Sequence, residues 1–151
     1  MNKLLIKASS NIARGFLFWL MNIKLTILNG FFFISLMLGI LLNTSLNYLI
    51  PFSGTYLYCF FVTIPLFILQ FVSIGSFSRK MKNAEPALFK KACIRPNGSK
   101  GNSINVASLF NEKIPFSEMN EQLLINDWNY TKRVVVYSML SFFTLIILFF
   151  I

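Results

Sequence analysis

The sequence contains no histidine and only five acidic residues among 151. Without histidine the chain lacks the commonest general base, a usual zinc ligand and the base of Ser–His and Cys–His nucleophile pairs. Because there are only two cysteines, Cys59 and Cys93, a disulfide framework is not expected. Walker A and dinucleotide-binding glycine motifs are also missing. We therefore expect a non-enzymatic protein with no catalytic residues, no metal site and no cofactor.

Charge is missing altogether from residues 25–77. This stretch contains two apolar runs, joined at Pro51-Phe52-Ser53-Gly54, whose composition predicts a turn. Each run is long enough to cross a bilayer, which takes about 20 apolar residues. We predict transmembrane helices over residues 25–48 and 55–77, and a third over residues 134–151. The chain is therefore predicted to be an all-α membrane protein with three transmembrane helices.

The basic residues lie on one side of these predicted spans. Of the fourteen Lys and Arg residues, four precede the first span and ten lie in residues 79–133, together with all five acidic residues. Because Lys and Arg accumulate on the cytoplasmic side of a membrane, we predict that the N-terminus is inside and the C-terminus outside. Residues 79–133 then form a basic cytosolic loop.

This topology explains most of the net charge of +9. We favour it over nucleic-acid binding, which the net charge of +5 on the loop keeps as an alternative.

Residues 1–24 carry apolar side chains at spacings of three and four, with Lys3, Lys7 and Arg14 on a different face. This pattern predicts an N-terminal amphipathic helix that lies in the lipid headgroup region. A plain cytosolic extension of the first span is one alternative. Another divides residues 12–50 into two short helices around Asn29-Gly30. It would give four spans and place the three basic residues outside, against the charge rule.

Polar and small residues within the first two predicted spans share helix faces. They are Ser35, Gly39, Asn43 and Asn47 in the first span, and Thr63, Gln70 and Ser73 in the second. Such residues stabilise contacts between membrane helices. We predict that these faces form helix–helix interfaces, either between protomers of a homo-oligomer or within one chain. A pore lining is the alternative. Pro65 is predicted to kink the second span, with Thr63 or a neighbouring residue helping to satisfy the freed carbonyl.

The loop is predicted to be partly helical. Residues 85–94 fit a short helix with Pro86 in its first turn, and Ser117 fits the N-cap of a helix that continues to the membrane surface. Residues 95–103 are rich in turn-forming residues and are predicted to be flexible. Cys93 has basic neighbours that would lower the pKa of its thiol, but a lone loop cysteine more often has no special role, and we favour that interpretation. The residues predicted to contact a partner or lipid headgroups are Arg79, Lys80, Lys82, Lys90, Lys91, Arg95 and Lys100.

These features favour a subunit of a bacterial inner-membrane complex. It would lie in the lipid bilayer, form a homo-oligomer through its spans and dock a cytosolic protein partner through residues 79–133. The chain is rich in Phe, Ile, Asn and Lys, and this composition favours a bacterial source. On that composition alone, we favour a role in antiviral defence. One alternative is an immunity protein against a membrane-active bacteriocin or a contact-delivered toxin. Another is a small channel or holin-like pore.

Overall fold

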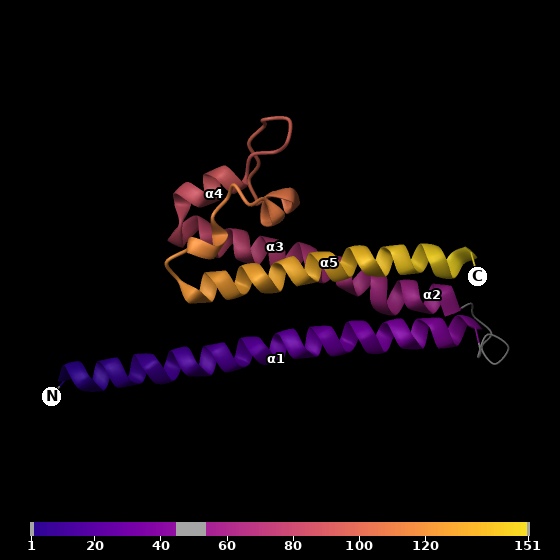
Figure 1. Ribbon diagram of the computed structural model, residues 1–151, viewed down its shortest axis with the longest axis horizontal. Helices are drawn as coiled ribbons and strands as arrows, with labels where there is room; N and C mark the ends of the chain where they lie inside the picture. Colours follow the sequence, from indigo (N-terminus) through magenta and orange to yellow (C-terminus); the bar gives the residue numbers. More distant parts are fainter. Residues whose placement is uncertain (1, 45–53, 151) are drawn as a thin grey trace.

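The computed structural model describes residues 2–44 and 54–150, which are helical except for the connections around the short helices between residues 85 and 121. Among the described residues, three helical segments are long enough to span a membrane. They lie side by side along the long axis of the molecule (Figure 1). The first is α1 (Asn2–Thr44), and the third is α5 (Gln122–Phe150). The second is continuous through α2 (Gly54–Tyr58), the π-helical turn η1 (Cys59–Thr63) and α3 (Ile64–Ala84).

All three segments are long and apolar enough to cross a membrane, over Asn22–Thr44, Gly54–Ala84 and Gln122–Phe150. The prediction of an all-α chain with three such helices is therefore confirmed for the described residues. In α1 the helix runs without interruption through Asn29 and Gly30. The four-span alternative, which needs a turn there, is wrong. A glycine inside a membrane helix is tolerated because no water competes for the backbone hydrogen bonds.

Several predictions about the first span fall outside what the structure describes. The predicted end of the span at residue 48, the turn residues Pro51, Phe52 and Ser53, and Asn47 lie outside the described residues. The backbone is helical from Asn2 onward, in one piece with the span. The side chains of residues 1–14 are not described, so their amphipathic character stays a prediction.

Pro65 lies directly after the π-helical turn η1. In this turn the Ile64 N–H donates to the Cys59 carbonyl, five residues earlier. A π-turn beside a proline rearranges the backbone hydrogen bonds around the missing N–H. The predicted role of Thr63 is wrong, since its hydroxyl is buried without a hydrogen-bond partner among the described residues.

The second and third helical segments both extend beyond the predicted spans. α3 continues to Ala84, past the predicted end at residue 77, and α5 begins at Gln122 rather than near residue 134. Ser117 is not the N-cap of α5, because it lies in the short 3-10 helix η3 (Phe116–Glu118). The carbonyl of Glu121 instead accepts the first two bonds of α5, from the N–H groups of Leu124 and Ile125. The extended backbone of Met119 separates the two helices while its side chain is buried.

Residues 85–121 fold into a compact unit, which we call the head, at one end of α3 and α5 (Figure 1). It contains α4 (Pro86–Ala92), which confirms the predicted short helix, the 3-10 helix η2 (Val106–Phe110), and η3. Its apolar core also includes side chains of α3 and α5. The buried core residues are Ile74, Phe77, Met81, Ala92, Ile104, Leu109, Ile114, Phe116, Met119, Leu124 and Val135. The loop between the second and third spans is therefore a packed structure.

The narrow loop over residues 95–103 has defined geometry. Ile94 and Lys100 form an isolated antiparallel β-bridge, and the Arg95 N–H donates to the Ser99 carbonyl at 2.9 Å. Gly98 takes φ 81°, a left-handed conformation that glycine adopts without a steric penalty. This tight turn explains why the sequence is rich in turn residues here.

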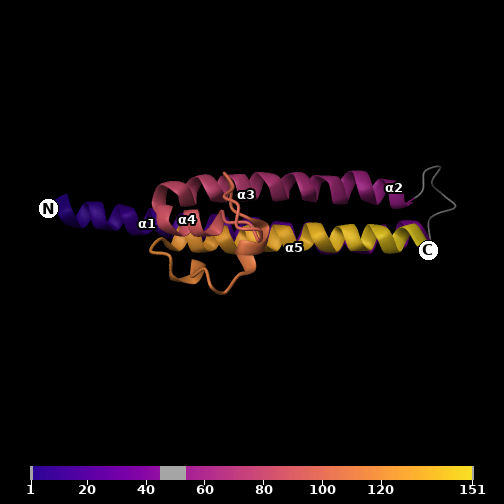
Figure 2. The ribbon, with the colours of Figure 1, turned by 90° about the horizontal axis from the view of Figure 1, so that it is seen from above.

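The three long helical segments pack around a second apolar cluster. It is formed by Leu28, Phe32, Tyr58, Val62, Leu66, Val134 and Leu148. Figures 1 and 2 both show that the N-terminal part of α1 projects beyond the ends of α3 and α5. The head and the N-terminus lie towards the same end of the bundle, and the C-terminus lies at the other (Figure 1).

Candidate functional site

A polar cluster joins all three long helical segments at the end of the bundle away from the head. The Asn43 Nδ2 group donates to the Leu148 carbonyl at 3.0 Å. The Thr55 hydroxyl lies 3.1 Å from Asn43 Oδ1 and 3.0 Å from the same Leu148 carbonyl. Leu148 belongs to the last described turn of α5. Its carbonyl is thus bonded by side chains from both of the other long helical segments, Asn43 of α1 and Thr55 of α2.

Next to this cluster, two glycines let α1 and α2 approach closely. A Cβ atom added to Gly39 would lie 2.5 Å from Cδ2 of Tyr58, whose side chain is buried. A Cβ atom added to Gly54 would lie 3.0 Å from the backbone of Leu42 and Asn43. The predicted small-residue contact at Gly39 is thus a contact with the second span of the same chain.

A second group of polar side chains lies between α3 and α5. The Ser138 hydroxyl is hydrogen-bonded to Gln70 Oε1, and the Ser73 hydroxyl donates to the Gln70 carbonyl at 3.0 Å. Gln70, Ser73 and Ser138 are all buried. Within lipid, a glutamine amide that faced the acyl chains would cost several kcal/mol, on the order of the penalty for an unsatisfied polar group. The seam between α3 and α5 removes that cost.

A third polar contact, between α1 and α5, was not predicted from the sequence. The Tyr137 hydroxyl donates to Asn29 Oδ1 at 2.8 Å, and the Tyr137 ring stacks on Phe32 with 4.4 Å between ring centroids. The signal for it was weak, because a single tyrosine beside Lys132 and Arg133 resembles an interfacial aromatic residue. Ser35, which was predicted to share the Gly39 face, is half-buried on α1.

Four of the six described residues of the predicted interfaces therefore meet other residues of the same chain. Gly39 and Asn43 face α2 and α5, and Gln70 and Ser73 lie against α5. Of the two locations that the sequence left open, this geometry uses the contact within one chain. Asn43 and Gln70 are engaged in hydrogen bonds across the bundle.

The predicted basic contact residues lie at the head end of the molecule. Arg79, Lys82, Lys90, Lys91, Arg95 and Lys100 are exposed. Lys80 is also exposed, but its Nζ lies 2.5 Å from Oδ2 of Asp127 on α5. Asp127 thus ties the end of α3 to the first turns of α5, beneath the head.

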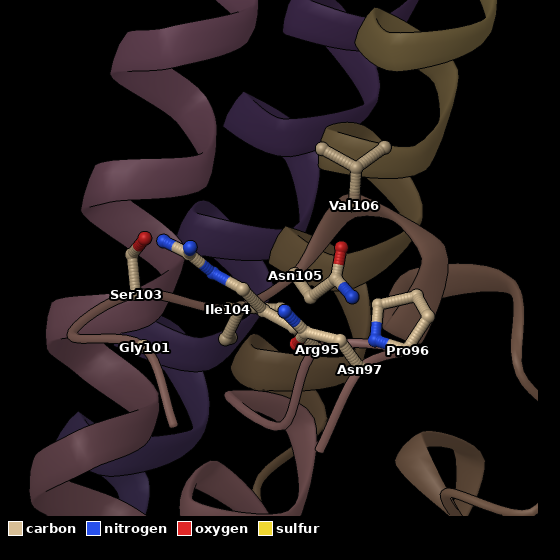
Figure 3. Close-up of a pocket in the computed structure, with 8 residues that line it drawn as sticks. All are labelled: Arg95, Pro96, Asn97, Gly101, Ser103, Ile104, Asn105 and Val106. Carbon is tan, nitrogen blue, oxygen red and sulfur yellow. The ribbon is translucent and has the colours of Figure 1, made fainter. Parts of the chain in front are cut away.

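Arg95 lies between two adjoining grooves on the head. The first groove has a volume of about 450 Å³, and Ser103 and Val106 are among the residues that line it. The second groove has a volume of about 400 Å³, and Lys91 is among its lining residues. Both include Pro96 and Asn105. Figure 3 shows Arg95 extended across the first groove towards Ser103, with Pro96 at the other end. The arrangement presents a guanidinium group, which has five donors, beside apolar and amide side chains.

Cys93 is buried beneath this loop, at the end of α4. Burial raises the pKa of the Cys93 thiol, because the thiolate loses solvation. The expectation that its basic neighbours lower the pKa is wrong, since those side chains point into solvent while the thiol is 4 % exposed. A neutral buried thiol of this kind is a packing residue.

Within residues 2–44 and 54–150, no three Cys, Asp or Glu side chains come together in a group that could hold a metal ion. No protein-family model matches the chain, and no curated protein and no solved structure proves similar to it. Its function is therefore inferred from its own residues and their arrangement.

Proposed function

We propose that this chain is a non-enzymatic subunit of a bacterial inner-membrane complex that docks a cytosolic protein partner through the head. The observation that carries the proposal is the head itself. It is a folded unit with an apolar core, held directly on two membrane-length helices. A segment whose only task was to connect two spans would need no such core.

The surface of the head supports a partner with an acidic segment. The exposed cations Lys90, Lys91, Arg95 and Lys100 lie on α4 and on the adjoining loop. The two grooves that share Arg95 give this surface a concave shape. Arginine beside a groove suits bidentate recognition of a carboxylate. Opposite charge on the partner would raise the association rate more than the affinity.

The distribution of charge supports an orientation with the N-terminus and the head in the cytosol and the C-terminus outside. Both basic segments, before the first span and around the head, belong to the same end of the bundle (Figure 1). In the proposed complex several copies associate through apolar faces that remain exposed in the monomer, such as Phe60, Phe61 and Phe71. The setting that we propose, from residue composition alone, is antiviral defence.

The docking proposal is tested by photo-crosslinking in cells. A photoreactive amino acid is placed at Asn97, which is exposed and lines the same groove as Arg95, and a matched one at Phe71 on the exposed apolar side of α3. We expect one defined cytosolic adduct from position 97, and from position 71 no adduct except with a second copy of this chain. Reversing the charge of Lys91 and Lys100 to Glu should abolish the adduct while the protein level stays the same. Equal adducts from both positions, or an adduct that survives charge reversal, would contradict the proposal.

The assembly proposal is tested by the mass of the purified chain in mild detergent. We expect a defined homo-oligomer, and a strict monomer would refute this part. Protection of cells against a membrane-active toxin by this chain alone, without any cytosolic adduct, would favour the immunity alternative instead.

A further inference from the structure

A groove of about 300 Å³ lies where α1, α3 and α5 meet at the base of the head. Lys24 of α1 and Lys80 of α3 line it, together with Asp127 and Thr131 of α5. Leu69 and Val72 of α3 also belong to its wall. The groove shares no lining residue with the two grooves around Arg95.

The groove lies at the level where the apolar part of the bundle ends. Lys24 is the last charged residue before the charge-free stretch, and Arg79 and Lys80 are the first after it. From Lys24 to the end of α1 at Thr44, the helix rises about 30 Å, which is the thickness of the hydrocarbon core. Lys24 and Lys80 line the same groove, so both ammonium groups lie at one membrane–water interface.

The side chains that line the groove change from charged to apolar along α3. Lys80 is at the charged end, while Val72 and Leu69 lie eight and eleven residues earlier on the helix. At the α-helical rise these positions are about 12 and 16 Å deeper in the apolar part of the bundle. Val72 is 61 % exposed, so apolar surface continues from the groove towards the lipid. A charged mouth followed by an apolar wall matches the two parts of a phospholipid.

The charges of the groove favour an anion. Lys80 is paired with Asp127. Because this is the one ion pair among the described residues, Lys24 has no carboxylate partner in the described part of the chain. The groove therefore has one net positive charge. Ser76, at its rim, adds an exposed hydroxyl group. Basic pockets between membrane helices on the cytoplasmic side are suited to anionic headgroups.

We propose that this groove binds one anionic phospholipid, with its phosphate between the Nζ atoms of Lys24 and Lys80 and an acyl chain along Val72 and Leu69. The proposal rests on the membrane location in the proposed function, but not on the docking of a partner. In this arrangement Asp127 competes with the phosphate for Lys80. The Lys80–Asp127 pair therefore sets the affinity of the site.

The test uses the full chain in nanodiscs of phosphatidylcholine with or without phosphatidylglycerol, followed by native mass spectrometry of the lipid retained. We expect one phosphatidylglycerol per chain to be retained in preference to phosphatidylcholine. Each of Lys24→Gln and Lys80→Gln should lower the affinity for phosphatidylglycerol roughly fivefold, the effect of one lysine near an anionic surface. The matched control, Lys90→Gln on α4, removes the same charge from a residue that does not line the groove. It should change the affinity by less than about twofold, because salt screens an exposed charge outside the site.

The variant Asp127→Asn separates a binding role from a structural one. It should raise the affinity for phosphatidylglycerol several-fold, because it frees Lys80, whereas damage to the fold would lower it. Soluble glycerol phosphate should not compete at millimolar concentration, since it lacks the acyl chain; full competition would identify a free phosphate site and overturn the proposal. Equal retention of both lipids, or an equal loss in the Lys90→Gln control, would also overturn it. Failure of the chain to insert into nanodiscs would instead refute the membrane proposal.

Discussion

The close contact between Gly39 and Tyr58 gives a sharp prediction for the stability of the bundle. In Gly39→Ala the new methyl group would lie 2.5 Å from Cδ2 of the Tyr58 ring. Tyr58 is 2 % exposed and is packed within the second apolar cluster, together with Leu28, Phe32 and Leu148. It cannot turn away without displacing its neighbours, so the helices must separate. Overpacking of this kind costs about 1–3 kcal/mol.

Gly30→Ala is the matched control on the same helix. A Cβ atom at Gly30 would meet nothing within 4 Å. Both variants are stabilised to the same extent by the higher helix propensity of alanine, about 1 kcal/mol in water. That gain cancels when the two variants are compared. We therefore expect Gly39→Ala to be less stable than Gly30→Ala by about 1–3 kcal/mol.

The difference is measured by titrating the detergent-solubilised protein with SDS. Energy transfer between dyes at the exposed positions Leu41 and Phe71, with the native cysteines replaced, reports the separation of the helices. Replacing Tyr58 by Ala should remove the penalty of the Gly39 variant, which gives a coupling energy of about 1–3 kcal/mol in the double-mutant cycle. Equal stabilities of the two alanine variants, or a coupling energy near zero, would refute the proposed contact.

Three further predictions concern the seam between α3 and α5 and the head. Gln70→Leu should lower the free energy of unfolding by only about 0.6 kcal/mol in the same SDS titration, as is typical of a hydrogen bond between membrane helices. The same variant should leave ion flux through liposomes unchanged, and an altered flux would favour the pore alternative. Trp128→Phe removes the 3.0 Å hydrogen bond from Nε1 to the Leu109 carbonyl, at a cost of about 1–3 kcal/mol. Amide exchange in the head should therefore accelerate roughly fivefold or more; unchanged exchange would contradict this bond. Cys93 should be alkylated more slowly than a cysteine placed at the exposed Asn97, and its rate should reach half of its maximum above the pKa of free cysteine, because burial raises the pKa of the thiol. Equal rates would show that the thiol is accessible.

The spans were predictable because a membrane-length apolar helix can be recognised from the composition of a continuous stretch of the sequence. No tertiary contact is needed to recognise a run of 20 apolar residues. The polar faces were also predictable from spacing, since residues four apart share a face. What they face was not, because the rotation of each helix depends on contacts such as those of Gly39 with Tyr58 and of Asn43 with Leu148.

The head was missed for a different reason. Part of its core comes from short segments without a helical or strand period, among them Ile104, Ile114 and Phe116. Periodicity is the main signal for structure in a single sequence, and such segments have none. Ser117 illustrates the same limit. It has the composition of an N-cap, yet the burial of Met119 moves the start of the helix to Gln122.

The core of the head has a consequence for where this protein can be divided. Ile74, Phe77 and Met81 belong to α3, and Leu124 and Val135 belong to α5. A fragment cut at the membrane surface, such as residues 79–133, would lose Ile74, Phe77 and Val135 and would expose the rest of that core to water. We therefore expect residues 79–133, expressed alone, not to form a stable soluble domain. Because the head shares its core with α3 and α5, a change in the packing of the head would act directly on these two helices.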